Sequence, residues 1–345
     1  MIGNLNGVDM ASRDQANRIL LPQKISQAEA KVQALRATFK MNPSEYYRHD
    51  RVPKSKVAVN SELEWEEKRL ADLKAVRSTL EENEKDRQSD PSIPRRGLVY
   101  MDDSKKDDRV KVAISTGDVD HAKHVSTILP GMNNVPSEDI KDHVKNAELV
   151  NKHAADNAHI SQDQVATIAW MYDTPQGGQV VSSKYATKAS HEIGSALEGM
   201  HAFRHTNGIE RAHTSLLGHS YGSTTAGKVA KMVRKGVLDD LVMYGSPGAG
   251  AHDAREYNLD HGRPYVSGIK SDDAVKGKGT LNSKFGNNPM FMPGVKHLAN
   301  NSERDRSFFI PWKMFDRHSE YLEKGTSSLE DISRVVTNVP VKGEK

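Results

Sequence analysis

The stretch TSLLGHSYGSTTAGKVA, residues 214–230, decides the fold of this chain. Its first four residues are β-branched or aliphatic apart from one serine, which is typical of a strand. The pentapeptide GHSYG at 218–222 follows, and beyond it apolar residues recur at helical spacing from Ala226 to Val233. A strand, a tight turn and a helix around Gly-x-Ser-x-Gly are the context that a nucleophile elbow requires.

Both glycines of the pentapeptide have a physical task. Gly218 and Gly222 flank Ser220 at positions where a side chain would keep the strand and the helix apart. The serine between them has to occupy a strained turn, which persists only where the surrounding structure enforces it. We therefore interpret Ser220 as a nucleophile, against the simpler explanation that the pattern arose by chance.

The composition describes a polar chain that still has enough apolar residues for a core. The 345 residues are 36% hydrophobic, and the mean hydropathy is −0.69. This length favours one large α/β domain with an accessory segment. The 49 basic and 46 acidic residues give a net charge of +3, which is too balanced to indicate a nucleic-acid or anionic-membrane partner. The absence of cysteine excludes disulfides, a thiolate nucleophile and a cysteine-based zinc site.

No targeting signal is recognisable in the sequence. The N-terminal stretch MIGNLNGVDMASRDQANR has no basic region followed by an apolar one, so no signal peptide is expected. No run of about 18 apolar residues occurs, so no transmembrane segment is expected either. The expectation is a soluble protein that is cytoplasmic by default.

Residues 1–95 are predicted to form a charged helical hairpin. The stretch 25–39 has apolar residues at helical spacing, and an Asn-Pro pair ends this first helix. Ser61 and Glu64 have the spacing of a capping box, so a second helix is expected from Ser61 to about Arg87. The hairpin is expected to pack on the main domain as a scaffold or as an arm that docks another protein.

Residues 96–345 are predicted to form an α/β domain, because strands alternate with helices along this part of the chain. Strands are predicted at 98–101, 110–115, 124–129, 165–171, 214–217, 241–244, 264–269 and 308–310, and helices at 137–158, 183–204, 226–236 and 328–336. The stretch 276–301 is rich in glycine and asparagine and is expected to be a loop or a cap over a site. The pattern predicts a mostly parallel sheet with helices on both faces.

Candidate catalytic residues follow the predicted strands, because functional groups in an open α/β sheet gather beyond the carboxyl ends of the strands. Asp272 and Asp273 follow one strand, and His318 precedes the last helix. His318 would take the proton of the Ser220 hydroxyl and later donate it to the leaving group. A carboxylate would orient the imidazole and complete a catalytic triad. We favour Asp273 for this role because it directly precedes an Ala-Val step, with Asp272 as the alternative acid.

An acyl-transfer site also needs an oxyanion hole made of two backbone N–H donors. The residue after the nucleophile supplies one of them, here Tyr221. The loop after the third strand, LPGMNN at 129–134, supplies the other from Met132 or from Asn133. These features are weak one by one, and their joint occurrence in this order along the chain is what carries the interpretation.

Two histidine pairs have the spacing of metal ligands, but neither has an evident third ligand. His121 and His124 stand near two aspartates, and His201 and His205 are four residues apart on a predicted helix. No glutamate completes an H-E-x-x-H pattern, and no glycine-rich nucleotide-binding motif follows a strand. We therefore predict neither a metal nor another cofactor.

The chain resembles an α/β-hydrolase family of unknown function that is common in actinobacteria and their phages. The segments that carry the resemblance are GNLNGVDMASRDQANR, KVAISTGDVDHAKHVSTILPGMNN, AWMYDTPQ, LLGHSYGSTTAG, LVMYGSPGAG, SDDAV and DRHSEYLEKGTSSLEDISRVV. The resemblance implies an α/β-hydrolase fold, with Ser220 as nucleophile, His318 as base and an aspartate of SDDAV as acid. It also supports LPGMNN as the oxyanion loop.

These features together predict a serine hydrolase that cleaves an ester through an acyl-enzyme, with an activity of the carboxylesterase or lipase type. The expected substrate is a small-molecule or lipid-like ester. An acyltransferase, which passes the acyl group to an acceptor other than water, is a close variant. The alternative from another class is a non-catalytic binding or assembly protein that keeps the fold and docks through its N-terminal helices.

Overall fold

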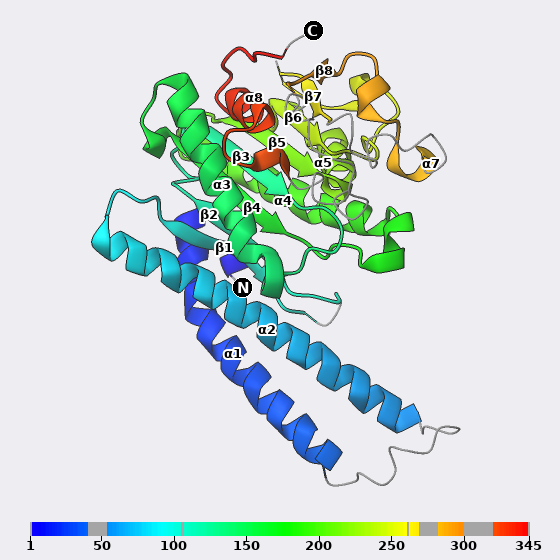
Figure 1. The fold of residues 1–345 in the computed structure, drawn as a ribbon. Coiled ribbons are helices and arrows are strands. Elements are labelled where there is room, and N and C mark those ends of the chain that lie inside the picture. The colour runs from blue at the N-terminus through cyan, green and yellow to red at the C-terminus, as the bar shows by residue number, and fades with distance from the viewer. Residues whose placement is uncertain are drawn as a thin grey trace.

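The fold is built on one sheet, which a long helical hairpin adjoins at its first strand (Figure 1). A computed structural model describes residues 2–40, 54–104, 107–260, 262–268, 282–299 and 320–343. Within these ranges the strands are β1 (Arg96–Asp102), β2 (Lys111–Thr116), β3 (His124–Leu129), β4 (Val165–Met171), β5 (His213–His219), β6 (Asp240–Tyr244), β7 (Pro264–Ser267) and β8 (Lys296–His297). The helices are α1 (Met10–Lys40), α2 (Lys54–Ser89), α3 (Pro136–Ala158), α4 (Lys184–Thr206), α5 (Tyr221–Met232), α7 (Asn282–Phe285) and α8 (Ser327–Val336).

The strand order in the sheet is β1-β2-β4-β3-β5-β6-β7-β8. β2 runs antiparallel to both of its neighbours, and every other neighbouring pair after it is parallel. The strands from β3 to β8 therefore end at one edge of the sheet, which we call the carboxyl edge. The predicted architecture, a mostly parallel sheet with helices on both faces, is confirmed.

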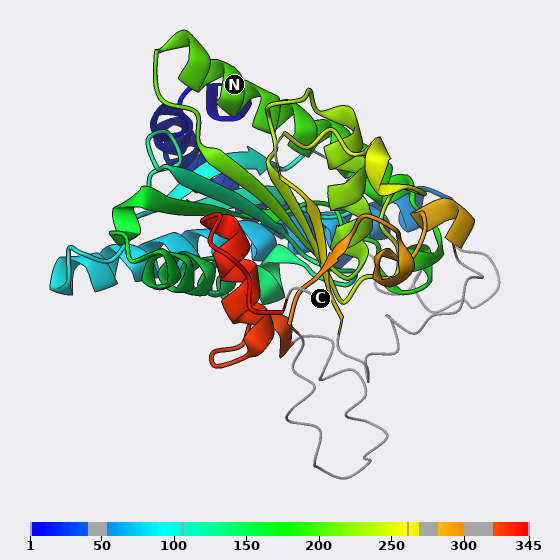
Figure 2. The ribbon, with the colours of Figure 1, turned by 90° about the horizontal axis from the view of Figure 1, so that it is seen from above.

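The two faces of the sheet are covered by different helices, as the view from above shows (Figure 2). Helices α4 and α5 pack together on one face, while α3 and α8 pack together on the other. The predicted central strand β4 is buried at all seven positions, and its side chains alternate between the two clusters. Burial of each large apolar side chain in such a cluster stabilises the fold by about 1.5–3 kcal/mol.

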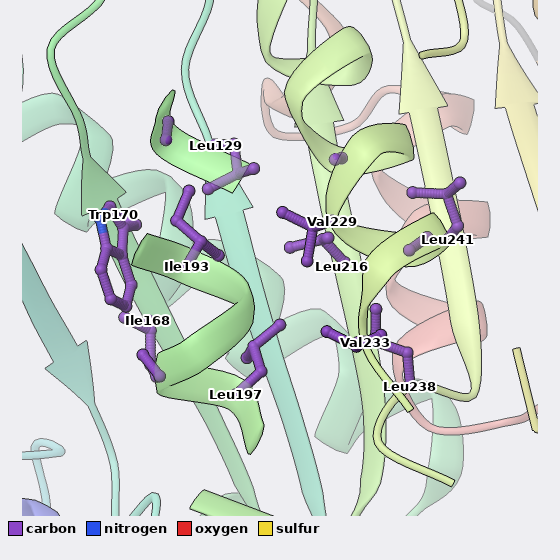
Figure 3. Close-up of a cluster of buried hydrophobic side chains, with 14 of the residues drawn as sticks. Leu129, Ile168, Trp170, Ile193, Leu197, Leu216, Val229, Val233, Leu238 and Leu241 are labelled. Carbon is purple, nitrogen blue, oxygen red and sulfur yellow. The ribbon is translucent and has the colours of Figure 1, made fainter. Parts of the chain in front are cut away.

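The cluster under α4 and α5 brings together side chains from β3, β4, β5 and both helices (Figure 3). Leu216 of β5 and Val229 of α5 are fully buried in it, and so are Ile168 of β4 and Ile193 of α4. The helix that follows Ser220 is thus fixed on the sheet by apolar packing along its length.

Side chains of the N-terminal segment cover the outer edge of β1. The Asp14 carboxylate accepts a hydrogen bond from the Leu98 N–H at 2.6 Å, and the Asn17 amide donates to the Leu98 carbonyl at 2.9 Å. Further along the strand, the Asn4 amide donates to the Met101 carbonyl and accepts from the Met101 N–H. The apolar cluster on this side of the sheet also includes residues of α1 and α2. The boundary at residue 95 remains a prediction.

Both predicted N-terminal helices exist, but the predicted start of the second was wrong. α1 begins at Met10, because Asp9 accepts from the Ser12 N–H and Asp120 accepts from the N–H groups of the first turn. α2 begins at Lys54, so Ser61 lies inside a helix instead of capping one. Serine costs little in a helix interior, and its spacing to an acid is therefore a weak signal there.

The stretch 276–301 was expected to be an unpatterned loop or cap, and this was wrong for part of it. Residues 282–299 include α7 and the two-residue strand β8, which pairs in parallel with β7. A strand of two residues shows no alternation, so the sequence gives no signal for it. The strand predicted at 308–310 lies outside the described residues.

Candidate active site

Ser220 forms the turn between β5 and α5 at the carboxyl edge. Its backbone has a φ of 50° and a ψ of −124°, a conformation that is costly for a residue with a side chain. The strain is held by neighbours, because the Ser220 N–H donates to the Tyr244 carbonyl at 2.9 Å and the Ser220 carbonyl accepts from the Ser223 N–H. The strained serine at the end of a parallel strand has the geometry of a nucleophile elbow.

The two glycines of the elbow leave no room for a side chain. A Cβ on Gly218 would lie 2.6 Å from the Gly222 carbonyl oxygen, and a Cβ on Gly222 would lie 2.5 Å from the Pro130 carbonyl oxygen. Both obstacles are backbone atoms, which cannot rotate away. The structure therefore confirms the steric role that the sequence predicts for these glycines.

The loop after β3 touches the serine. A Cβ on Gly131 would lie 2.9 Å from the Ser220 Cβ, so the loop passes within contact distance of the elbow. Asn133 has a φ of 61°, and its N–H donates to the Pro175 carbonyl at 3.0 Å. Among the described residues, none accepts a hydrogen bond from the Met132 N–H. The loop that the sequence singled out thus lies beside Ser220.

Tyr221 is the first residue of α5, so its N–H has no partner within the helix. Its side chain is buried and plays a different part from its backbone. The hydroxyl donates to the Ser182 carbonyl at 2.6 Å and accepts from the Ala186 N–H, and the ring contacts Phe285 of α7. Burial raises the pKa of Tyr221 to about 12, so the phenol stays neutral. The side chain thus ties α4, α5 and α7 together.

Buried hydroxyl groups of α5 and of the loop after β6 form a hydrogen-bonded network that supports the elbow. This network was not predicted from the sequence. The Ser223 Oγ lies 2.6 Å from both the Ser220 carbonyl oxygen and the Ser246 Oγ. The Thr224 Oγ1 donates to the Gly248 carbonyl at 2.8 Å. These contacts join the first turn of α5 to the loop after β6. The only sequence signal was the Ser-Pro-Gly turn at the end of that strand.

The predicted acid and base, Asp273 or Asp272 and His318, lie outside the described residues. The described chain next to each of them is close to the elbow. β7 ends at Ser267, whose carbonyl accepts from the Gly245 N–H at the carboxyl edge. The Tyr321 ring, 1% exposed, packs against Tyr244, the residue whose carbonyl binds the Ser220 N–H.

The residues of the first histidine pair have partners of other kinds. His121 forms an exposed pair with Asp118 at 2.9 Å, and the Asp120 carboxylate caps α1. His124 packs against His213, and burial together with that neighbour lowers the pKa of His124 to about 4. Within the described part of the chain, no group of three or more histidine, aspartate or glutamate side chains could hold a metal ion.

A buried carboxyl group lies after β4 at the same edge. Asp173 is 8% exposed, and one of its carboxyl oxygens has no hydrogen-bond partner among the described residues. Burial, and then the nearby charge of Asp108, raises the pKa of Asp173 to about 6. A carboxyl group with such a pKa changes its charge just below neutral pH, which makes the edge sensitive to pH.

The strand order, the parallel carboxyl edge and the serine elbow after β5 together define an α/β hydrolase. The chain belongs to the alpha/beta hydrolase family, whose sequence profile matches residues 105–283. In the described part of the chain, no helix is both long enough and apolar enough to cross a membrane.

Its relatives include mycobacterial proteins. The chain is 29% identical over 242 residues to the uncharacterized protein Rv0963c of Mycobacterium tuberculosis, and the match covers 68% of this chain and 84% of that protein. A second uncharacterized protein of the same species, Rv2079, is 34% identical over 186 residues, and the match covers 50% of this chain and 26% of that protein. The chain therefore spans only a quarter of this second relative.

Two solved structures that this chain is similar to are distant from it in sequence. A dienelactone hydrolase from Anabaena variabilis has a TM-score of 0.38 and 11% identity, with coverage of 71% of this chain and 96% of that one. An esterase from Rhizomucor miehei has a TM-score of 0.37 and 13% identity, with coverage of 74% and 90%. Likeness at this level carries no argument about a substrate.

Proposed function

We propose that the protein is a serine hydrolase that cleaves an ester through an acyl-enzyme, with Ser220 as the nucleophile. The observation that carries the proposal is the strained serine between β5 and α5, set against the loop after β3. A strained backbone at the carboxyl edge of a parallel sheet is a costly feature that is typical of a catalytic residue. Membership of the alpha/beta hydrolase family supports the same reaction class.

In this mechanism the Ser220 hydroxyl attacks the ester carbonyl while His318 accepts the hydroxyl proton. His318 then protonates the leaving alcohol, and the same histidine activates the water that releases the acid. Asp273, or Asp272 in its place, orients the imidazole. The proposal is supported by Tyr321, which stands three residues beyond His318 in the sequence and packs beside the elbow.

The proposed oxyanion hole consists of the N–H groups of Tyr221 and Met132. Tyr221 begins α5, where the helix leaves its first N–H groups unpaired and adds a favourable dipole. Asn133 was the alternative to Met132. Its N–H already donates to the Pro175 carbonyl, which favours Met132 as the second donor.

The proposed substrate is a small-molecule or lipid-like ester, and the activity is of the carboxylesterase or lipase type. Transfer of the acyl group to another acceptor would use the same acyl-enzyme. The two outcomes differ only in what attacks this intermediate, so product analysis with an added alcohol separates them.

The test compares wild-type protein with Ser220→Ala, using a fluorophosphonate probe and p-nitrophenyl butyrate. We expect the variant to lose both labelling and hydrolysis, because the attacking oxygen is gone. Ser195→Ala, at an exposed position of α4, is the matched control and should keep both. Equal labelling of wild type and Ser220→Ala would refute the proposal, and an absence of labelling and hydrolysis in both would leave a non-catalytic binding role.

A second pair of variants separates the two candidate acids. Loss of the orienting carboxylate lowers kcat by about 10⁴-fold in the best-studied triads. We expect this loss for Asp273→Asn and a much smaller one for Asp272→Asn. The reverse order would assign the role to Asp272.

A further inference from the structure

A buried tyrosine hydroxyl joins the two elements that carry the proposed oxyanion donors. Tyr172 directly follows β4, and its side chain is 2% exposed. Its hydroxyl donates to the Pro130 carbonyl at 3.1 Å and accepts from the Thr225 Oγ1 at 3.2 Å. Pro130 belongs to the loop that contains Met132, and Thr225 belongs to α5, which begins with Tyr221.

The chemistry of the phenol fits this position. A phenol has one proton to donate and can also accept, so a single oxygen serves both neighbours. Burial raises the pKa of Tyr172 far above neutral pH, so the hydroxyl keeps its proton. The Pro130 carbonyl needs such a donor, because a buried carbonyl without a hydrogen-bond partner destabilises the fold.

The C-terminal half of the loop at 129–134 is held by the residues that follow Tyr172. The Thr174 hydroxyl donates to the Asn134 carbonyl at 2.7 Å, and the Gly177 N–H donates to the Asn133 side chain at 2.8 Å. The Pro175 carbonyl accepts from the Asn133 N–H. Met132 thus lies between a half fixed by Tyr172 and a half fixed by segment 174–177.

We propose that Tyr172 is a positioning residue of the oxyanion hole, which sets the distance between the loop at 129–134 and helix α5. This inference rests on the proposed function. The Tyr172 hydroxyl is hydrogen-bonded to the loop and to the helix at once, whereas segment 174–177 is bonded to the loop. Its hydroxyl therefore fixes the Met132 N–H relative to the Tyr221 N–H.

The expected effect follows from how narrowly oxyanion donors must be placed. Each donor has to lie about 2.7–3.1 Å from the oxyanion, and loss of one donor lowers kcat by about 10²–10³-fold. Tyr172→Phe keeps both donors but releases one side of the loop. We therefore expect kcat to fall about tenfold, with KM unchanged within about twofold, because the donors act on the transition state more than on the bound ester.

The experiment measures kcat and KM for p-nitrophenyl butyrate, inhibition by a boronic acid that forms a tetrahedral adduct with serine, and unfolding in urea. Tyr257→Phe is the matched control, because Tyr257 is also buried and its hydroxyl donates to the Ala249 carbonyl at 2.7 Å. Tyr172→Phe should lose boronate affinity in parallel with kcat. Tyr257→Phe should lose stability alone. Thr225→Val removes the hydrogen bond between Tyr172 and the helix and should lower kcat about threefold. It replaces Tyr172→Phe as the test if that variant does not fold.

Four outcomes would overturn the inference. A kcat of Tyr172→Phe within twofold of the wild-type value would by itself contradict the inference. An unchanged kcat in Thr225→Val would also contradict it. Equal losses in Tyr172→Phe and Tyr257→Phe would show that general destabilisation is the cause. Absence of Ser220-dependent hydrolysis in the wild type would overturn the proposed function and this inference together.

Discussion

The elbow around Ser220 and the outer edge of β1 are both held by tight contacts to backbone, but the contacts are of opposite kinds. At the elbow, backbone lies against backbone so closely that a Cβ on Gly222 would stand 2.5 Å from a carbonyl oxygen. At the edge of β1, side chains fill the gap and bind the Leu98 N–H and carbonyl. At the elbow the close contacts are possible because side chains are absent. At the edge of β1 the contacts are made by the polar ends of side chains.

This difference determines what each region tolerates. A steric contact between backbones has no substitute, so any added atom displaces a strand, the helix or the loop at 129–134. A polar contact at the edge of a sheet can be replaced in part by water, because an edge strand reaches solvent when its cover is removed. Changes at the elbow should therefore affect activity, and changes at the edge should affect stability alone.

Among the substitutions that compare these two regions, Gly222→Ala is expected to have the largest effect. The new methyl group would meet the Pro130 and Leu129 carbonyl oxygens, at 2.5 and 2.6 Å. We expect the free energy of unfolding to fall by about 3 kcal/mol. We also expect kcat/KM to fall by about 100-fold or more, since displacing Pro130 moves the proposed oxyanion loop. Urea denaturation and hydrolysis of p-nitrophenyl butyrate measure the two quantities.

Gly178→Ala is the control for this substitution. No atom stands within 4 Å of the position that its Cβ would take, so both quantities should stay near the wild-type values. Full activity in Gly222→Ala would show that the elbow accommodates an added methyl group. That result would contradict the contrast between the two regions.

The second prediction concerns Asn17→Ala at the edge of β1. Asn17 is 2% exposed, and its amide donates to the carbonyls of Gly3 and Leu98. Leaving these carbonyls without a donor should lower the free energy of unfolding by about 2–3 kcal/mol. The kcat per folded molecule should not change, because β1 is remote from Ser220 in the strand order.

Asn207→Ala provides the comparison for an exposed amide. The Asn207 side chain donates to a carbonyl at the exposed end of α4, and its removal should cost less than about 0.5 kcal/mol. A fall in kcat in Asn17→Ala, counted per serine titrated with the fluorophosphonate probe, would contradict the separation of the two regions.

The same contrast explains what could be predicted from the sequence. The elbow is encoded in five consecutive residues, and β4 in a continuous apolar run, so both were predictable. The bond between Asn17 and Leu98 joins residues that lie far apart in the chain, and it exists only once the sheet has placed β1 beside α1. The Tyr172 hydroxyl is of the same kind, since its partners come from the loop after β3 and from α5.

Short elements and helix ends were the other source of error. The two residues of β8 are too few for any periodicity, and the start of α1 depends on Asp120, a residue from a later turn. Ser61 shows the opposite error, because a local capping pattern occurred inside a helix. Local patterns identify elements, while the contacts between elements depend on the fold.

The smallest expected effect is on the pH dependence of stability. It concerns two buried carboxylates, Asp14 at the edge of β1 and Asp173 at the carboxyl edge. Asp14 accepts from the Leu98 N–H and from two arginines, whereas one oxygen of Asp173 has no partner in the part of the chain that the structure describes. Burial and the charge of Asp108 raise the pKa of Asp173 to about 6. The pKa of an aspartate in the unfolded chain is about 3.9. The folded state therefore binds this proton more tightly than the unfolded state does.

The sign of the pH dependence follows from this difference. The protonated group contributes its full stability below about pH 4, and the contribution is lost as the pH rises through about 6. A difference of about two pKa units limits the effect to about 3 kcal/mol, and partial hydration of the carboxylate should reduce it to about 1–2 kcal/mol. Asp173→Asn removes the titration, so its stability relative to wild type should increase from pH 4 to pH 7. The exposed Asp163→Asn should run parallel to wild type in the same urea series. A constant difference between Asp173→Asn and wild type would contradict the raised pKa of Asp173.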